Sequence, residues 1–305
     1  MNLYWSVYKN LEKEVLVLAN QIHFDDIQLK VYSVKIAELL IRCSVEIESI
    51  AKDLFLANGG TMPTGRDLYF DTDCMELLEN KWLISKKQVL VSAQNFYFTN
   101  TSNRIITPLN KSNKRGTSGS DWKKAYQAVK HNRTFSLSKG NIKNLIRAMG
   151  ALYLLNIYFK ADKFDLKKDL SGVNFDDRLG SELFSVKIHI NTSISVFSAY
   201  TKKPDFDECV YLLKATDETS QIAREALQRI QEKQKTLNTN HLLETIKGAV
   251  KEAGFTAENA QSKIEEIVKD ENTKIGPKYF KQAFRTESES FRNLMYEAII
   301  NKNQA

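Results

Sequence analysis

The chain has 305 residues, of which 42% are hydrophobic and 27% are charged, as in an ordinary globular protein. This length allows one or two domains with a sizeable core. With only 4 Pro and 12 Gly, the sequence contains few enforced breaks and favours helices. The three cysteines are odd in number and far apart, which argues against a disulfide framework and against a CxxC zinc motif.

The sequence carries no sign of membrane targeting. Its amino terminus lacks the basic start and the uninterrupted apolar core of a signal peptide. The longest strongly apolar run, at about 149–159, is shorter than the roughly 20 residues that span a bilayer. We therefore expect a cytoplasmic protein without membrane contact.

Helical periodicity dominates the first half of the chain. Apolar residues recur at three- and four-residue steps, most clearly in the second of the expected helices. These helices span residues 3–19, 33–57, 74–82, 120–132 and 141–159. The last has little polar surface, so we expect it at the centre of a four- or five-helix bundle. Either Ser120 or Asp121 is expected to cap the helix at 120–132.

The middle of the chain favours extended structure. Residues 87–98 are expected to be extended. Residues 183–200 alternate apolar and polar side chains as a strand or hairpin does, and residues 208–215 can pair with them. His189 lies within this alternation, and we interpret it as an ordinary half-buried strand histidine.

The carboxy-terminal part is helical again from residue 217, with breaks expected at Gly254 and at Gly276-Pro277. The expected fold class is mainly α: a helical bundle, then a small β-hairpin or α+β segment, then C-terminal helices. These three parts are assigned to residues 1–160, 161–215 and 216–305.

Positive charge is concentrated in one window of the sequence. Between Arg104 and Arg147 there are 11 Lys and Arg residues and a single acid, Asp121, while the other residues together carry a net charge of −3. The net charge of +7 therefore arises entirely within this basic window. Solvated faces usually mix both signs, so we interpret the window as a site for a polyanion rather than as an ordinary basic surface.

Several kinds of site are missing from the sequence. It contains no Gly-rich phosphate loop after a strand, and no HExxH, GxSxG, kinase or EF-hand motif. Its four histidines are scattered and define no metal site. We therefore expect neither a metal nor a cofactor, and any catalysis would depend on Lys, Arg, His and hydroxyl groups.

Catalysis by Lys, Arg, His and hydroxyl groups suits the internal transesterification of RNA. His131 can serve as the base for the 2′-hydroxyl, and cations stabilise the phosphorane-like transition state. Lys124 lies two helical turns earlier, about 10 Å along the axis, so both side chains share one face. Arg133 adds a cation at the helix end. These three residues are the catalytic candidates.

Other residues are candidates for holding RNA or for support. Those expected to contact RNA or phosphate are Arg115, Trp122, Lys123, Tyr126, Lys130 and Asn132. For Trp122 and Tyr126, an i,i+4 pair, core packing competes with base stacking. Those expected to support the site are Arg42, Glu46 and Glu48. The two glutamates flank the apolar stripe of the helix at 33–57: both can be solvated, or one can reach a cation of the basic helix.

Three of these segments resemble HEPN-superfamily proteins: Ser44-Val-Glu-Ile-Glu48 on a long helix, W-x-x-x-Y-x-x-x-K-H-N-R from Trp122 to Arg133, and the apolar helix that follows. The resemblance covers about residues 33–159. It implies a HEPN-like bundle that forms a homodimer, and a metal-independent endoribonuclease of toxin, abortive-infection or antiviral-defence systems. The family's usual signature has an Arg upstream of the His, whereas Lys124 stands upstream here and lacks the bidentate fork of Arg. In a dimer, Arg42 or Arg133 of the second chain can complete the site.

Two other functions are compatible with the same residues. The chain can be a non-catalytic module that binds RNA, such as tRNA, or a nucleotide, with a structural His131. It can also be a scaffold subunit of a defence complex, with its C-terminal helices as the docking surface. An antitoxin is a further possible partner. We favour the ribonuclease because His131 lies where the positive charge is densest.

Overall fold

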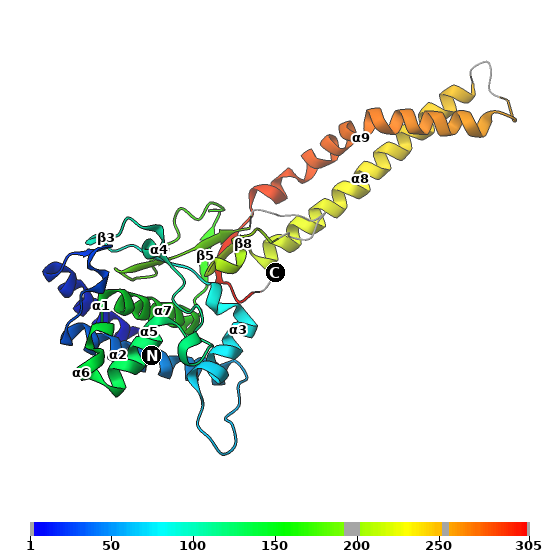
Figure 1. Ribbon diagram of the computed structural model, residues 1–305. Coiled ribbons are helices and arrows are strands. Elements are labelled where there is room, and N and C mark those ends of the chain that lie inside the picture. The colour runs from blue at the N-terminus through cyan, green and yellow to red at the C-terminus, as the bar shows by residue number, and fades with distance from the viewer. Residues whose placement is uncertain (1–2, 192–201, 252–255, 304–305) are drawn as a thin grey trace.

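The structure is a helical bundle that carries small sheets and a long projecting helical hairpin (Figure 1). The computed structural model describes residues 3–191, 202–251 and 256–303. The bundle helices are α1 (Leu3–Gln21), α2 (Val34–Ala57), α3 (Glu76–Trp82), α5 (Asp121–His131) and α7 (Ile142–Lys160). The prediction of a mainly α fold is therefore confirmed.

Helix α7 lies at the centre of the bundle, as its apolar sequence predicts. Every residue from Ala148 to Tyr158 is buried, and the helix packs against α1, α2 and α5. The start of α2 is set by Ser33, whose side chain accepts a hydrogen bond from the amide of Ile36 at 3.2 Å. None of the helices in the described ranges combines the length and the apolar character that crossing a bilayer requires.

Short elements connect the bundle helices. They are a π-helical turn (Phe70–Met75), α4 (Thr101–Arg104), α6 (Arg133–Ser136) and 3-10 turns at 28–30, 84–86, 116–118, 137–139 and 206–208. The strands β1 (Phe24–Asp25) and β3 (Phe96–Tyr97) form a short parallel pair. The π-helical turn is the part of these connections that contacts α2 most closely, and it brings acidic side chains toward α5.

Two small sheets accompany the bundle. The first contains, in order, β4 (Ile105–Ile106), β2 (Val89–Val91) and β6 (Phe184–Val186), all antiparallel. The second contains, in order, β5 (Phe164–Lys167), β9 (Tyr296–Ile300), β8 (Tyr211–Ala215) and β7 (Ile188–Ile190). Because β8 pairs with β7, the predicted pairing between segments 208–215 and 183–200 is present.

A long helical hairpin connects the neighbouring strands β8 and β9 (Figure 1). Its first helix, α8 (Asp217–Val250), leads away from the sheet, and its second, α9 (Ala260–Arg292), leads back. Near the sheet, Leu227, Ile230 and Ala283 bury a small apolar cluster between the two helices. The hairpin therefore has an apolar contact at its base, separate from the main core of the bundle.

Three details of the fold differ from the sequence predictions. Helix α9 continues through Gly276-Pro277, where the sequence predicts a break, and Gln234 of α8 supports this point by donating to the Gly276 carbonyl at 3.1 Å. The end of the predicted helical region forms β9, because its apolar residues pair between β5 and β8. The strands β6 and β7 enter two different sheets instead of forming one hairpin, and residues 192–201 lie outside the described part of the chain.

Candidate nucleic-acid interface

The inner face of α5 belongs to the core. Trp122 and Tyr126 are 2% and 1% exposed, and Ala125 and Val129 beside them are also buried. The indole Nε1 of Trp122 donates to the carbonyl of Pro108 at 2.8 Å. Neither ring can therefore stack on a base, and core packing is the correct interpretation of this i,i+4 pair.

The three predicted catalytic residues are all exposed, Lys124 and His131 on α5 and Arg133 on α6, but Lys124 lies apart from the other two. Lys124 pairs with Asp121 at 3.0 Å. His131, the last residue of α5, is exposed, and its Nε2 lies 3.2 Å from the side-chain oxygen of Gln127. Arg133 is exposed at the start of α6. Their spacing keeps Lys124 about 10 Å from His131 along the helix axis.

Asn132 has a structural role between α5 and α6. Its side-chain oxygen accepts a hydrogen bond from the amide of Phe135 at 3.5 Å, so it caps α6. Capping residues satisfy backbone donors that a helix leaves open at its start. This contact orients the exposed Arg133, the first residue of α6, relative to the end of α5.

One flank of α5 holds an ion-pair network that the sequence does not reveal. Asp71, in the π-helical turn, accepts hydrogen bonds from Lys123 at 2.6 Å and from Arg115 at 2.9 Å. Burial alone would raise the pKa of Asp71, but these hydrogen bonds outweigh it and lower the pKa below its usual value. The guanidinium of Arg115 also lies 3.9 Å from the centre of the Tyr69 ring. Two of the predicted RNA ligands thus share one internal carboxylate.

Glu48 of α2 reaches the same flank. Its Oε2 accepts a hydrogen bond from the Tyr126 hydroxyl at 3.5 Å, and that hydroxyl accepts one from Lys130 Nζ at 3.3 Å. Burial raises the pKa of Glu48, although the charges of Lys130 and Lys123 oppose the effect. Of the two glutamates that flank the stripe of α2, Glu48 is therefore the one that approaches the basic helix.

These groups line a cavity whose charges are largely matched. The cavity has a volume of about 450 Å³ and lies between α2, the π-helical turn and α5. Its charged lining residues are Glu48, Asp71, Lys52, Arg115 and Lys123. Two carboxylates and three cations give the lining a net charge of only +1. The cavity therefore attracts a phosphate weakly, and it is the weaker candidate for anion binding.

Two of the predicted supporting residues face α1 instead of α5. Arg42 donates to Glu14 of α1 at 2.6 Å. The carboxylate of Glu46 lies close enough to Tyr4 of α1 to raise the pKa of that phenol, after the larger effects of burial and of Asp53. Within one chain Arg42 therefore supports the α1–α2 contact, and its role in the site of a second chain stays a prediction.

The amino end of α5 opens into a cavity with unbalanced positive charge. This cavity, of about 380 Å³, is lined by the segment from Ser102 to Lys124 and by α7. Lys111, Lys124 and Arg147 line it, with Asp121 as the one acid among the described residues that line it. Burial lowers the pKa of Arg147, yet an arginine stays protonated at physiological pH. The cavity therefore attracts anions.

Ser120 adds an unused hydroxyl to this cavity. It occupies the cap position of α5, but its side chain makes no capping hydrogen bond, contrary to the prediction from the sequence. The residue is 7% exposed, and its Oγ has no hydrogen-bond partner among the described residues. The first amides of a helix also lack intrahelical partners and favour anions. Three cations and the amino end of a helix together can bind a phosphate group.

The sequence does not single out two of these cations. Lys111 and Arg147 belong to the basic window and are far apart in the chain, but they line the same cavity, because the segment before α5 and helix α7 both border it. The signal that sequence does offer is the near absence of acids from the window, which leaves few internal partners for its cations. Which cations of the window line the cavity becomes clear only from the three-dimensional packing of the helices.

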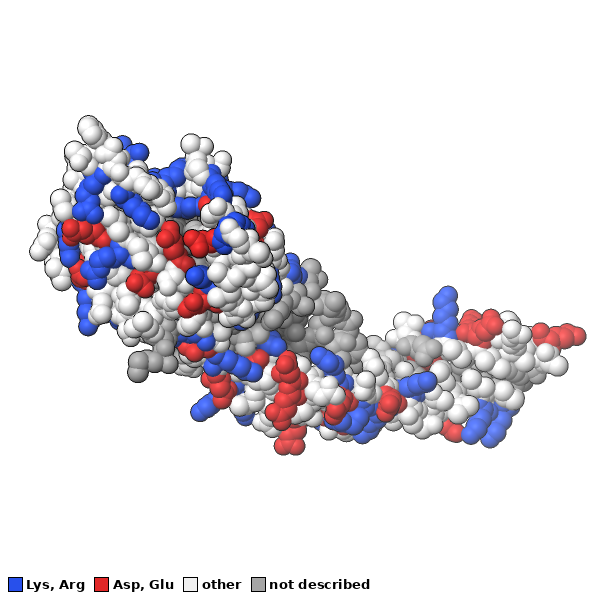
Figure 2. Space-filling view, turned by 90° about the horizontal axis from the view of Figure 1, so that it is seen from below, with Lys and Arg blue, Asp and Glu red and all other residues white. Residues whose placement is uncertain are grey.

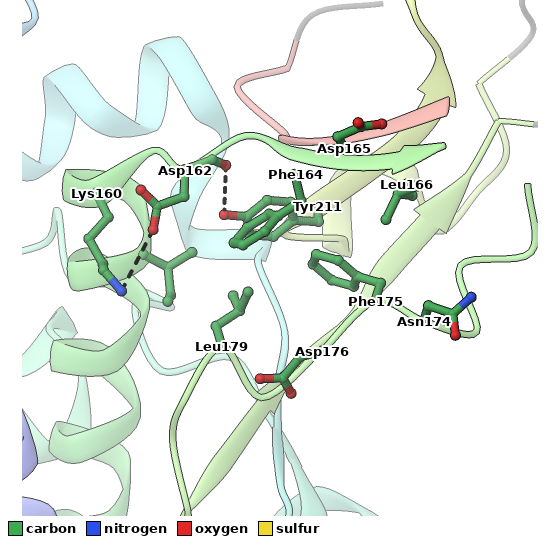
Figure 3. Close-up of a pocket in the computed structure, with 11 residues that line it drawn as sticks. Lys160, Asp162, Phe164, Asp165, Leu166, Asn174, Phe175, Asp176, Leu179 and Tyr211 are labelled. Carbon is green, nitrogen blue, oxygen red and sulfur yellow. Dashed lines mark hydrogen bonds and ion pairs between the residues drawn. The ribbon is translucent and has the colours of Figure 1, made fainter. Parts of the chain in front are cut away.

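A third cavity lies where the end of α7 meets the second sheet (Figure 3). Its volume is about 320 Å³, and the rings of Phe164, Phe175 and Tyr211 contact one another in its wall, with centres 5.2–5.8 Å apart. The Tyr211 hydroxyl donates to the carbonyl of Asp162 at 3.0 Å. The acids that line this cavity are Asp162, Asp165 and Asp176. They make it unsuited to a phosphate.

The projecting hairpin lacks the positive excess of α5. Figure 2 shows basic and acidic side chains interspersed along it. Residues 206–305 contain 15 basic and 16 acidic residues. Attraction of a polyanion is therefore expected at the bundle and not at the hairpin.

Comparison with known proteins adds no identification. No family model matches the sequence, and no curated protein and no solved structure matches it significantly. The resemblance to HEPN proteins stays a prediction from the motifs of α2, α5 and α7.

Proposed function

We propose that this protein binds RNA through the exposed face of α5 and the cavity at its amino end. The observation that supports this most is that Lys111, Lys124 and Arg147 line one cavity together with Ser120, whose hydroxyl has no partner among the described residues. A backbone phosphate carries one negative charge and several acceptor oxygens, which match these cations and this donor. With one acid in the cavity lining, the attraction is not cancelled internally.

A bound RNA strand would continue from this cavity along the solvent side of α5. Lys124 stands at the cavity, and His131 and Arg133 lie exposed at the other end of the helix. An extended strand can follow such a row of cations because each phosphate makes its own contact. The choice of RNA follows the HEPN resemblance, and a free nucleotide is the alternative ligand for the same cavity.

Cleavage of RNA is the second candidate function. It is favoured by the exposure of His131, whose imidazole is accessible and has the cations Lys130 and Arg133 nearby in sequence. A neutral imidazole can take the proton of a 2′-hydroxyl, and a cation can stabilise the charge that develops on phosphate. Because Lys124 lacks the bidentate fork of an arginine, the arginine of a complete site would come from a second chain in a homodimer. A role in defence or as a toxin, with an antitoxin partner, follows from the resemblance alone.

Binding is tested by fluorescence anisotropy of a labelled single-stranded RNA in EDTA. The double variant Lys111→Ala/Lys124→Ala is expected to weaken binding about tenfold or more, since a hydrogen bond to a charged group contributes roughly 1.5–3 kcal/mol. Ser120→Ala should weaken binding without lowering the melting temperature, because its Oγ has no partner among the described residues. Unlabelled nucleotide added as competitor distinguishes the two ligands.

The matched control is Lys269→Ala/Lys281→Ala on α9. Both lysines are exposed, and their loss changes the net charge by the same amount. If this control weakens RNA binding as much as the double variant at the cavity, binding follows net charge only and the proposed site is wrong.

Cleavage is tested separately by incubating tRNA with the protein in EDTA and separating the products on a gel. His131→Ala should abolish cleavage while RNA binding persists. Intact tRNA with the wild-type protein, or equal cleavage by the variant, would reject the second function and leave the first standing.

A further inference from the structure

Three metal-ligating side chains meet beside the second sheet, away from α5. His189 is the middle residue of β7, and Asp205 and Cys209 lie on either side of the 3-10 turn at 206–208 that precedes β8. The Nδ1 of His189 lies 3.2 Å from Asp205 Oδ1, and the Sγ of Cys209 lies 3.8 Å from Asp205 Oδ2. One ligand atom from each residue lies within 4.8 Å of the other two.

These separations match a tetrahedral metal site. Zinc bonds of about 2.0–2.3 Å to nitrogen, oxygen and sulfur place neighbouring ligand atoms about 3.4–3.6 Å apart. The pairs His189–Asp205, at 3.2 Å, and Cys209–Asp205, at 3.8 Å, are close to that spacing, and the third pair, His189–Cys209, lies within 4.8 Å and would have to draw together around an ion. A set of imidazole, carboxylate and thiolate is a zinc donor set, whereas calcium and magnesium prefer oxygen alone.

The backbone that carries the ligands is held in place. Asn301, after β9, is buried, and its side-chain nitrogen donates to the carbonyl of Phe206 at 2.7 Å and to that of Cys209 at 3.1 Å. The parallel pairing of β7 with β8 sets His189 opposite Leu212. Ligands positioned by a fixed turn and a paired strand need little rearrangement to bind an ion.

The three side chains differ in exposure, and a buried cation lies near Cys209. The side chains of His189 and Cys209 are buried, while Asp205 is partly exposed and offers a route of entry. Lys87 is fully buried near Cys209, and its ammonium has no hydrogen-bond partner among the described residues. A thiolate formed on metal binding would give this cation an anionic neighbour.

We propose that His189, Asp205 and Cys209 bind one Zn²⁺ ion, with a fourth position open to water or to another ligand. Binding forms a zinc–sulfur bond and releases the thiol proton of Cys209 to solvent. Two negative ligands and a neutral imidazole balance the charge of the ion, which a buried site requires. The scattered histidines give no sequence signal for this set, because His189 lies in a strand and Asp205 comes 16 residues later in the chain. The proposal is independent of RNA binding.

The test is the metal content of the purified full chain after incubation with zinc and removal of the excess. Mass spectrometry of the metals is expected to find about one zinc per chain, and cobalt in its place should give a thiolate-to-cobalt charge-transfer absorption. Asp205→Asn and Cys209→Ser should each lose the bound ion and this absorption. The half-exposed Asp205 is the safer variant because its amide keeps the size of the side chain.

The controls are His241→Gln on α8 and Cys74→Ser in the π-helical turn, which remove the same types of side chain elsewhere. Both should keep the zinc. Zinc should also raise the melting temperature of the wild-type protein but not that of Asp205→Asn, because an ion that binds only the folded state stabilises it. The proposal is overturned if the folded wild-type chain retains no zinc, or if Asp205→Asn and Cys209→Ser retain as much as the controls.

Discussion

Lys87 gives the most quantitative prediction about stability. Its side chain is fully buried, and burial lowers the pKa of its ammonium from 10.5 to about 8. Since each pH unit of such a difference corresponds to about 1.4 kcal/mol, carrying the charge at neutral pH costs the folded state about 3 kcal/mol. Replacing Lys87 with Met keeps most of the side-chain volume and removes the charge. We expect Lys87→Met to be more stable at pH 7 by up to this amount.

The pH dependence has a definite sign. Below about pH 8 the lysine is protonated in both states, so the cost is present in full. Between about 8 and 10.5 the folded state loses its proton first, so the wild-type protein gains stability as the pH rises. The advantage of Lys87→Met should therefore shrink across that range.

The measurement is urea unfolding of both proteins in EDTA, at pH 7 and at about pH 10. Removing metal keeps the Cys209 thiol from changing the environment of the lysine. A variant that is less stable than the wild-type protein at pH 7 would refute the reasoning, because it would show that the ammonium has a stabilising partner.

Three further predictions concern the flank and the core of α5. Asp71→Asn should lower the free energy of unfolding by about 1–3 kcal/mol, because it leaves Lys123 without its carboxylate. The same change should strengthen RNA binding, because Lys123 and Arg115 become free to contact phosphate. Urea unfolding measures the change in stability, and fluorescence anisotropy measures the change in binding. Unchanged stability would contradict the ion pair. The pKa of Asp71 is lowered, so its contribution is present at neutral pH and is lost as the pH falls below about 4, where the variant and the wild-type protein should converge. Because burial raises the pKa of Glu48, ionising this carboxyl should make the wild-type protein less stable as the pH rises from about 4 toward neutral. Glu48→Gln cannot ionise there and should not show this decline. Melting temperatures of both proteins over that range measure the effect, and parallel curves would argue against it. Trp122→Ala should cost about 3–5 kcal/mol by emptying the core beneath α5, and a loss in urea unfolding below about 1 kcal/mol would contradict the buried position of the ring.

Periodicity made the bundle predictable. Helices α2 and α7 carry long apolar stripes, and a capping serine stands just before α2, so their type and position follow from local pattern. The strand β8 and its pairing with β7 follow from alternation. The sequence failed at Pro277, which normally ends a helix, because α8 packs alongside and contacts the backbone at Gly276.

The candidate sites were predictable only in part. The basic window and the exposed face of α5 follow from charge and from helical spacing. The pairing of Asp71 with Lys123 does not, because the two residues lie on separate elements and meet through the packing of the π-helical turn against the bundle. The same holds for His189 with Asp205, which lie 3.2 Å apart. Long-range contacts of this kind carry no local sequence signal.

The most direct test of RNA binding at the amino end of α5 is the salt dependence of the affinity. For single-stranded RNA, the slope of log K against log salt falls by about 0.7 for each phosphate contact removed. Lys111→Ala/Lys124→Ala should therefore have a slope about 1.4 smaller in magnitude than the wild-type protein. Lys269→Ala/Lys281→Ala on the hairpin should keep the wild-type slope. Identical slopes for the wild-type protein and both double variants would contradict the proposal that RNA phosphate binds in this cavity.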